Sequence, residues 1–114
     1  MSSDNGKIRG ADLVREVFAR VRTGDLSVSD LYTENAIILY GADGTAEGRE
    51  QIRAFYARTI EAMSPQPQVE AVVEDPPRFI AFVDVPTTSG HHRALDLFEL
   101  DEDGITRLEI FSRR

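Results

Sequence analysis

Apolar residues recur at steps of three and four in two segments of the chain, which is the spacing of a helix that buries one face. The first segment, residues 12–23, ends before Gly24, and glycine commonly terminates helices. The second, residues 49–63, is followed by serine and proline residues that stop a helix. A shorter pattern at residues 26–32 predicts a brief helix between the two.

Beyond residue 67 the apolar positions alternate with polar ones, as in strands with one buried face. Strands are predicted over residues 68–75, 78–85, 93–100 and 105–112. A loop is expected at residues 86–90 and a tight turn at residues 101–104. An earlier apolar run at residues 36–40 is too short for a buried helix, so it predicts one more strand, followed by a glycine-containing loop.

Helices before strands indicate an α+β domain in which three helices pack on one face of a curved antiparallel sheet. The face expected to meet the helices is nearly all apolar and carries Phe79, Ala81, Val83, Ala94, Phe98, Leu108 and Ile110. The opposite face mixes charged side chains with Ile80, Phe82, Leu95, Leu97 and Phe111. This outer face is more apolar than a fully solvated face needs, so we expect it to pair two copies of the chain as a homodimer.

Asp96 is the polar exception on the inner face, where it alternates with Ala94 and Phe98. A carboxyl group among apolar side chains is desolvated, which raises its pKa and suits it to act as a general acid near neutral pH. The alternative is structural: the carboxyl group bonds Tyr40 or a backbone amide and satisfies a buried polar network.

The composition narrows the class of protein. The chain has 114 residues, 41% of them apolar, which suits one domain; we expect a flexible segment at residues 1–11 and a single domain at residues 12–114. The net charge of −7 makes nucleic acid an unsuitable partner. No stretch is apolar and long enough for a membrane span or a secretory signal, so a cytoplasmic protein without membrane association is expected.

No metal site is predicted. The chain has no cysteine, and the adjacent His91 and His92 would point to opposite faces of a strand with no third ligand at a useful spacing. The pair is interpreted as a solvated loop end. His92 shares the strand parity of Asp96, which leaves a place for it at the rim of a pocket as a distant acid or base.

The order of the elements resembles the SnoaL-like branch of the NTF2-like superfamily, which includes ketosteroid isomerases and polyketide cyclases. The motifs that carry the resemblance are "GDL" (24–26), "LYTENAII" (31–38), "GREQIRAFY" (48–56) and "ALDLFELDEDGITRLEIF" (94–111). The resemblance spans the chain from about residue 12 to its end. It implies a cystatin-like cone in which helices and a curved sheet enclose a deep apolar pocket, and a homodimer through the outer face of the sheet.

The resemblance also implies positions for catalytic groups. Ketosteroid isomerases place an Asp base on the first strand, a Tyr on the first helix and a protonated Asp on the penultimate strand. Asp96 falls at the position of the protonated Asp. Tyr40, or Leu39 under a different gap, falls at the position of the base, and Val17 at that of the Tyr. Neither Tyr40 nor Leu39 can act as a carboxylate base, and Val17 cannot donate a hydrogen bond to an oxyanion. Classical steroid isomerase activity is therefore not assigned.

These features predict a cofactor-independent enzyme of isomerase, cyclase or dehydratase type that acts on a small apolar carbonyl or hydroxyl compound. Asp96 and Tyr40 are the predicted catalytic residues. The residues predicted to contact the compound are Val17, Phe18, Ile38, Phe55, Phe79, Ala81, Val83, Phe98, Leu108 and Ile110. Because the base and the Tyr of the family are missing, two alternatives remain: a ligand-binding module without catalysis, and a domain that serves only dimerisation.

Overall fold

The computed structural model describes residues 8–41, 44–88 and 90–113. Their elements, in chain order, are α1 (Gly10–Arg22), the 3₁₀ helix η1 (Leu26–Leu31), β1 (Tyr32–Leu39), β2 (Thr45–Glu47), α2 (Arg49–Met63), β3 (Gln68–Asp75), β4 (Arg78–Thr87), β5 (Gly90–Asp101) and β6 (Gly104–Arg113). The three predicted helices and five predicted strands are present. The predicted flexible segment at residues 1–11 falls mostly outside the described residues, and α1 already begins at Gly10.

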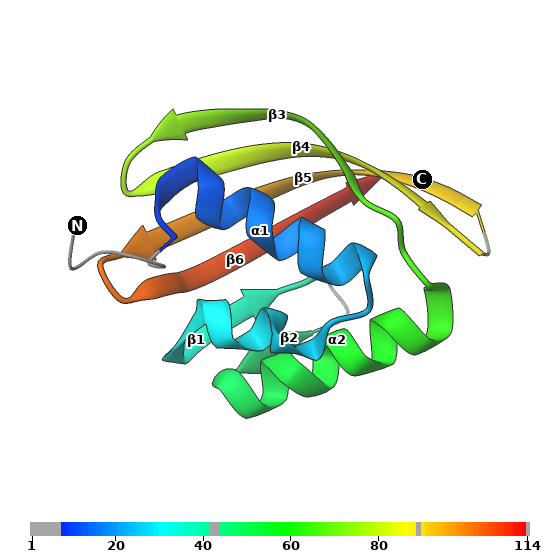
Figure 1. Cartoon of the computed structure of the whole chain (residues 1–114), viewed down its shortest axis with the longest axis horizontal. Helices are drawn as coiled ribbons and strands as arrows, with labels where there is room; N and C mark the ends of the chain where they lie inside the picture. The colour runs from blue at the N-terminus through cyan, green and yellow to red at the C-terminus, as the bar shows by residue number, and fades with distance from the viewer. Residues whose placement is uncertain (1–7, 42–43, 89, 114) are drawn as a thin grey trace.

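The strands form one six-stranded sheet in the order β2-β1-β6-β5-β4-β3. The sheet curves around α1, which contacts β3 and β4, while α2 lies beside β1 and β2 (Figure 1). Neighbouring strands run antiparallel except β1 and β6, which are parallel. The expectation of an antiparallel sheet therefore holds for every pair but this one, which joins two strands far apart in the sequence.

The core lies between α1 and the inner face of the sheet, as the alternation of apolar residues predicts. The buried side chains of α1 are Leu13, Val14, Val17, Phe18 and Val21, and those of the inner face include Phe79, Ala81, Val83, Phe98 and Leu108. The rings of Phe18 and Phe98 meet edge to face with their centroids 6.0 Å apart. Packing of this kind stabilises a domain through apolar area removed from water and through direct ring contact.

Three local assignments differ from the sequence-based expectation. β1 begins at Tyr32 and its pairing with β6 is irregular between Tyr32 and Ile37, so the apolar alternation that would reveal a strand is interrupted there. β2 spans only three residues, which is too short to show a period. The predicted loop at residues 86–90 is mostly strand, because β4 and β5 pair as far as Thr87 and Gly90.

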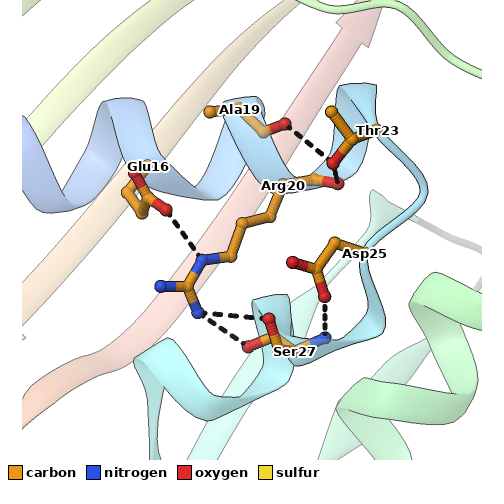
Figure 2. A network of polar contacts seen from close by, with 6 residues as sticks. All are labelled: Glu16, Ala19, Arg20, Thr23, Asp25 and Ser27. Carbon is orange, nitrogen blue, oxygen red and sulfur yellow. Dashed lines mark hydrogen bonds and ion pairs between the residues drawn. The ribbon is translucent and has the colours of Figure 1, made fainter.

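Arg20 fastens α1 to η1 across the turn between them. Its Nε donates to Oε2 of Glu16 at 2.8 Å, and its Nη1 donates to the carbonyl oxygen of Ser27 at 3.1 Å (Figure 2). Asp25 caps η1 by accepting a hydrogen bond from the backbone N of Ser27 at 2.9 Å. These bonds hold η1 between α1 and α2, which it also contacts. No helix in the described residues is both long and apolar enough to span a bilayer.

Candidate active site

A pocket of about 560 Å³ opens between α1, α2 and the inner face of β5 and β6. Its walls are mainly apolar and aromatic, as in most small-molecule sites. They are formed by Val17, Phe18, Val21, Tyr40, Gly41, Phe55, Tyr56, Thr59, Met63, Pro65, Pro67, Val85, His92, Ala94, Asp96, Leu108, Ile110 and Ser112. Among these, Asp96 and His92 are the side chains able to carry a charge near neutral pH.

Asp96 lies in the middle of β5, between Ala81 of β4 and Ile110 of β6. Its side chain is buried, with 6% of its surface exposed, and its Oδ1 has no hydrogen-bond partner among the described residues. Burial raises the pKa of this carboxyl group from 3.8 to about 7, because the charged form loses its water. Both the neutral acid and the carboxylate are therefore populated near neutral pH.

Two tyrosines near Asp96 form a buried hydrogen-bonded pair. The hydroxyl oxygens of Tyr32 and Tyr56 are 2.6 Å apart, and both side chains are buried. Burial raises the pKa of both hydroxyl groups, and the charge of Asp96 raises it further. Both hydroxyls thus keep their protons at neutral pH. Tyr56 also lines the pocket that contains Asp96.

The local sequence pattern does not predict this tyrosine pair. Tyr56 belonged to the apolar stripe of the helix at residues 49–63, and Tyr32 to the end of a short helix. A signal was present, because a tyrosine on the buried face of a helix needs a partner for its hydroxyl. The identity of that partner depends on how α2 docks against β1, which a local pattern does not contain.

Tyr40, the second predicted catalytic residue, lines the pocket but makes no described hydrogen bond to Asp96. Its ring packs on that of Phe55, with the centroids 4.8 Å apart and the planes at 33°. Its hydroxyl lies close to Gly44. The structural alternative for Asp96, a bond to Tyr40 or to a backbone amide, is not observed at Oδ1.

The predicted contact residues divide into two groups. Val17, Phe18, Phe55, Leu108 and Ile110 line the pocket with Asp96. Ile38, Ala81, Val83 and Phe98 are instead closed off in the core, with 2% or less of their surface exposed, and Phe79 lines a different cavity. Strand parity correctly places the members of this set that lie on β4, β5 and β6 on the inner face, but it does not tell which part of that face α1 covers and which part it leaves open.

The two histidines occupy strand positions rather than the predicted loop end. Nε2 of His91 contacts Oδ1 of Asp84 on one face of β5, and His92 lines the pocket on the other. Within residues 8–41, 44–88 and 90–113, no group of three His, Asp or Glu side chains is arranged to hold a metal ion. Arg93 is also directed away from the pocket, since it pairs with Glu70.

A larger cavity of about 970 Å³ lies at the other end of the sheet, between the start of α1 and the acidic turn after β5. Its lining includes Asp30, Phe79 and the turn at residues 101–104. Oδ1 of Asp101 accepts hydrogen bonds from the backbone N of Asp103 and Gly104 at 2.7 and 3.1 Å, so this carboxylate is satisfied within its own turn. The pocket at Asp96, which contains an unsatisfied buried acid, is therefore the better candidate for chemistry.

The sequence was compared with the models of known protein families and with curated proteins. The pattern of the SnoaL-like domain matches residues 14–108. No curated protein matches the sequence.

Solved structures share the fold over nearly the full chain. An NTF2-like protein of unknown function from Cytophaga hutchinsonii aligns with a TM-score of 0.81 at 20% identity, covering 94% of this chain and 92% of that one. A protein with a ketosteroid isomerase-like fold from Catenulispora acidiphila, crystallised with trimethylamine, gives 0.81 at 16% identity, covering 90% and 86%. The epoxide hydrolase/cyclase-like enzyme SalBIII, described in pyran ring formation in the polyether salinomycin, gives 0.78 at 21% identity, covering 89% and 88%. At these identities the comparisons establish the fold and not the activity.

Proposed function

Because this chain belongs to the SnoaL-like domain family and has its NTF2-like fold, we propose that it is a cofactor-independent enzyme that binds a small apolar carbonyl or hydroxyl compound in the Asp96 pocket. The observation that carries the proposal is the buried Oδ1 of Asp96, which has no described protein partner and lies in an apolar pocket. A buried polar atom of this kind is costly unless a ligand completes its hydrogen bonding.

The proposed role of Asp96 is that of a general acid. In its neutral form the carboxyl group donates a hydrogen bond, or its proton, to a carbonyl, ether or hydroxyl oxygen of the substrate. In a low-dielectric pocket such a donor stabilises negative charge that develops on the oxygen. Tyr56, whose hydroxyl stays protonated and is paired with that of Tyr32, lines the same pocket.

The pocket supports only part of the steroid isomerase mechanism. That reaction needs a carboxylate base as well as an acid, and among the described lining residues Asp96 is the one carboxylate. The reactions that suit this site are those that are accelerated mainly by general acid catalysis at an oxygen atom. Dehydration, cyclisation and the isomerisation of an activated substrate are examples. The cyclase-like activity described for SalBIII is compatible with this class.

The proposal is tested by measuring how binding of a cyclic enone depends on pH. Cyclohexenone accepts but does not donate hydrogen bonds, so it requires the neutral form of Asp96. Its affinity, measured by calorimetry, is expected to be constant at low pH and to fall about tenfold for each pH unit above the pKa of Asp96. Asp96→Asn keeps an N–H donor and is expected to bind the enone independently of pH, whereas Asp96→Leu loses the donor at every pH.

Two outcomes would remove Asp96 from the site: equal enone affinity in wild type and Asp96→Leu, or a wild-type affinity that does not change between about pH 5 and about pH 9. Once a substrate that is turned over has been found, Asp96→Asn is expected to lower kcat much more than it changes binding.

A binding module without catalysis is the second candidate. It is favoured by Tyr40, which occupies the position expected for the base but packs against Phe55. Such a module would show the same enone binding, with no product from any ligand that raises the melting temperature. Product formation is therefore the measurement that separates the two functions.

The outer face of the sheet supports the proposal of a homodimer. Phe82, Leu95 and Phe111 lie side by side across β4, β5 and β6, and Val73, Ile80 and Leu97 form a parallel row across β3, β4 and β5. We refer to these six residues as the outer apolar patch. Val73, Phe82 and Phe111 are 50%, 39% and 49% exposed.

The cytoplasmic location expected from the sequence stays a prediction.

A further inference from the structure

His92 lies on the same face of β5 as Asp96 and lines the same pocket, but nearer to the turn between β4 and β5. Four residues of a strand separate the two, and at about 3.3 Å per residue their Cα atoms are roughly 13 Å apart. Ala94, between them on this face, has a small side chain that leaves the wall open. On this strand the pocket wall therefore carries an ionisable side chain at each of two positions, with the apolar Ala94 between them.

The described lining residues near His92 are neutral. It pairs with Val85 across β4, and the pocket lining near this end includes Ser112 of β6, Thr59 and Met63 of α2, and the prolines that follow α2. No Lys or Arg is among the described lining residues. Among the described lining residues, His92 is thus the only one with a basic side chain and Asp96 the only one with an acidic side chain.

His92 and its neighbour His91 differ in their partners. His91 is bound to Asp84 on the outer face. For the half-buried His92, the hydrogen bonds and ion pairs of the described residues include no partner. An imidazole on a pocket wall without a protein partner retains two nitrogen atoms for a ligand.

We propose that His92 forms a second polar subsite that binds a carboxylate group, so that the substrates of this pocket are elongated apolar acids with a carbonyl or hydroxyl oxygen at the Asp96 end. The assignment of the oxygen to Asp96 rests on the proposed function, whereas the carboxylate subsite rests on His92 alone. A protonated imidazole donates a charge-assisted hydrogen bond to a carboxylate, which is stronger than a bond between neutral groups.

The test compares para-hydroxyphenyl alkanoic acids, from the acetic to the pentanoic acid, with their uncharged amides. Affinities are measured by calorimetry for wild type, His92→Gln and the matched control His91→Gln, at a pH below the pKa of Asp96. At the best-fitting chain length, wild type and His91→Gln are expected to bind the acid about tenfold more tightly than the amide, the factor typical of one charge-assisted hydrogen bond. His92→Gln is expected to lose this preference while its affinity for phenol itself is unchanged.

Hexanoic acid and hexanamide test the His92 end separately, because neither carries the phenol group. If cyclohexenone binds equally to wild type and Asp96→Leu but hexanoic acid is preferred over its amide in a His92-dependent manner, the proposed function of Asp96 fails and the carboxylate subsite stands. If no acid binds more tightly than its amide, or if the preference survives in His92→Gln, the subsite is refuted.

Nuclear magnetic resonance keeps the test valid if His92→Gln does not fold. The chain has two histidines, so their ring signals are easily assigned. Titration of wild type with hexanoic acid is expected to shift the ring resonances of His92 and to leave those of His91 unchanged. Equal shifts, or no shift of His92 at saturation, would refute the subsite.

Discussion

Asp96 makes the folding stability of this protein depend on pH. Its pKa is about 7 in the folded chain against an ordinary value of 3.8, so the folded state binds the proton more tightly than the unfolded state between these values. Stability is therefore expected to fall as the pH rises from about 4 to about 7, and to change little with this group above that. The loss amounts to at most about 4 kcal/mol, since a tenfold change in proton affinity corresponds to about 1.4 kcal/mol.

Urea denaturation at several pH values checks this prediction with Asp96→Asn, which keeps the shape of the side chain and removes the charge. Above pH 7 the variant is expected to be more stable than wild type, and the difference is expected to shrink as the pH falls. Asp30→Asn, which changes an exposed carboxylate, is the control and should retain the pH dependence of wild type. A stability of Asp96→Asn that stays below that of wild type at high pH would contradict the burial of an ionised carboxylate.

Residue-level chemistry was partly predictable from the sequence. The alternation around Asp96 correctly predicted a buried carboxyl group on the inner face, because strand parity is a local property. The position of His92 followed the same parity, yet the sequence alone favoured a loop end. Tyr40 was predicted to act with Asp96, and this role stays a prediction. The ring of Tyr40 packs on that of Phe55. The buried tyrosine hydroxyls that form a hydrogen bond are instead those of Tyr32 and Tyr56.

The contact between β1 and α2 depends on Tyr32. Its hydroxyl bonds that of Tyr56 on α2, and its carbonyl oxygen accepts hydrogen bonds from Nε and Nη2 of Arg49 at 3.1 and 2.8 Å. One residue of β1 is thus tied to both the first turn and the middle of α2. These bonds fix the helix that contributes Phe55, Tyr56 and Thr59 to the pocket.

Removing one hydroxyl of the tyrosine pair is expected to lower the free energy of unfolding by more than half of the loss caused by removing both. Tyr56→Phe leaves the buried hydroxyl of Tyr32 without its partner, which typically costs about 1–3 kcal/mol of the free energy of unfolding. Tyr32→Phe should have a similar effect, and the double variant should lose less than the sum of the two, because no unpaired hydroxyl remains. Urea denaturation of the three variants measures this coupling.

Tyr40→Phe is the control for that cycle, since the Tyr40 hydroxyl lies outside the pair; its effect should stay within about 0.5 kcal/mol. Additive losses in the double variant would mean that the two hydroxyls do not stabilise one another, in spite of their separation of 2.6 Å.

In the described part of the chain, the helices lie on one face of the sheet and no helix covers the other face (Figure 1). The outer apolar patch crosses four strands and is bordered by the ion pair Arg93–Glu70 and by the polar contact His91–Asp84. An apolar centre with a charged border is the usual composition of a protein interface. A second copy of the chain is the partner that we propose for it.

Sedimentation equilibrium tests the dimer. Wild type is expected to have the mass of two chains, and the double variant Phe82→Lys/Phe111→Lys the mass of one, because four buried charges would face each other across the interface. Ala54→Lys, which adds a charge on the exposed face of α2, should remain dimeric. A single-chain mass for wild type at micromolar concentration would contradict the proposal.

Local patterns determined much of this protein. The periods of apolar residues specified α1, α2, and the strands β3 to β6, and they specified that Asp96 faces inward, because each of these properties depends on residues close together in the sequence. The tertiary structure decided the rest: the parallel pairing of β1 with β6, the three-residue strand β2, the Tyr32–Tyr56 bond, and which inner-face residues border a pocket instead of the closed core. The physical reason is that a repeating pattern encodes which face of an element is buried, whereas the partner of that face is set by packing between segments far apart in the chain.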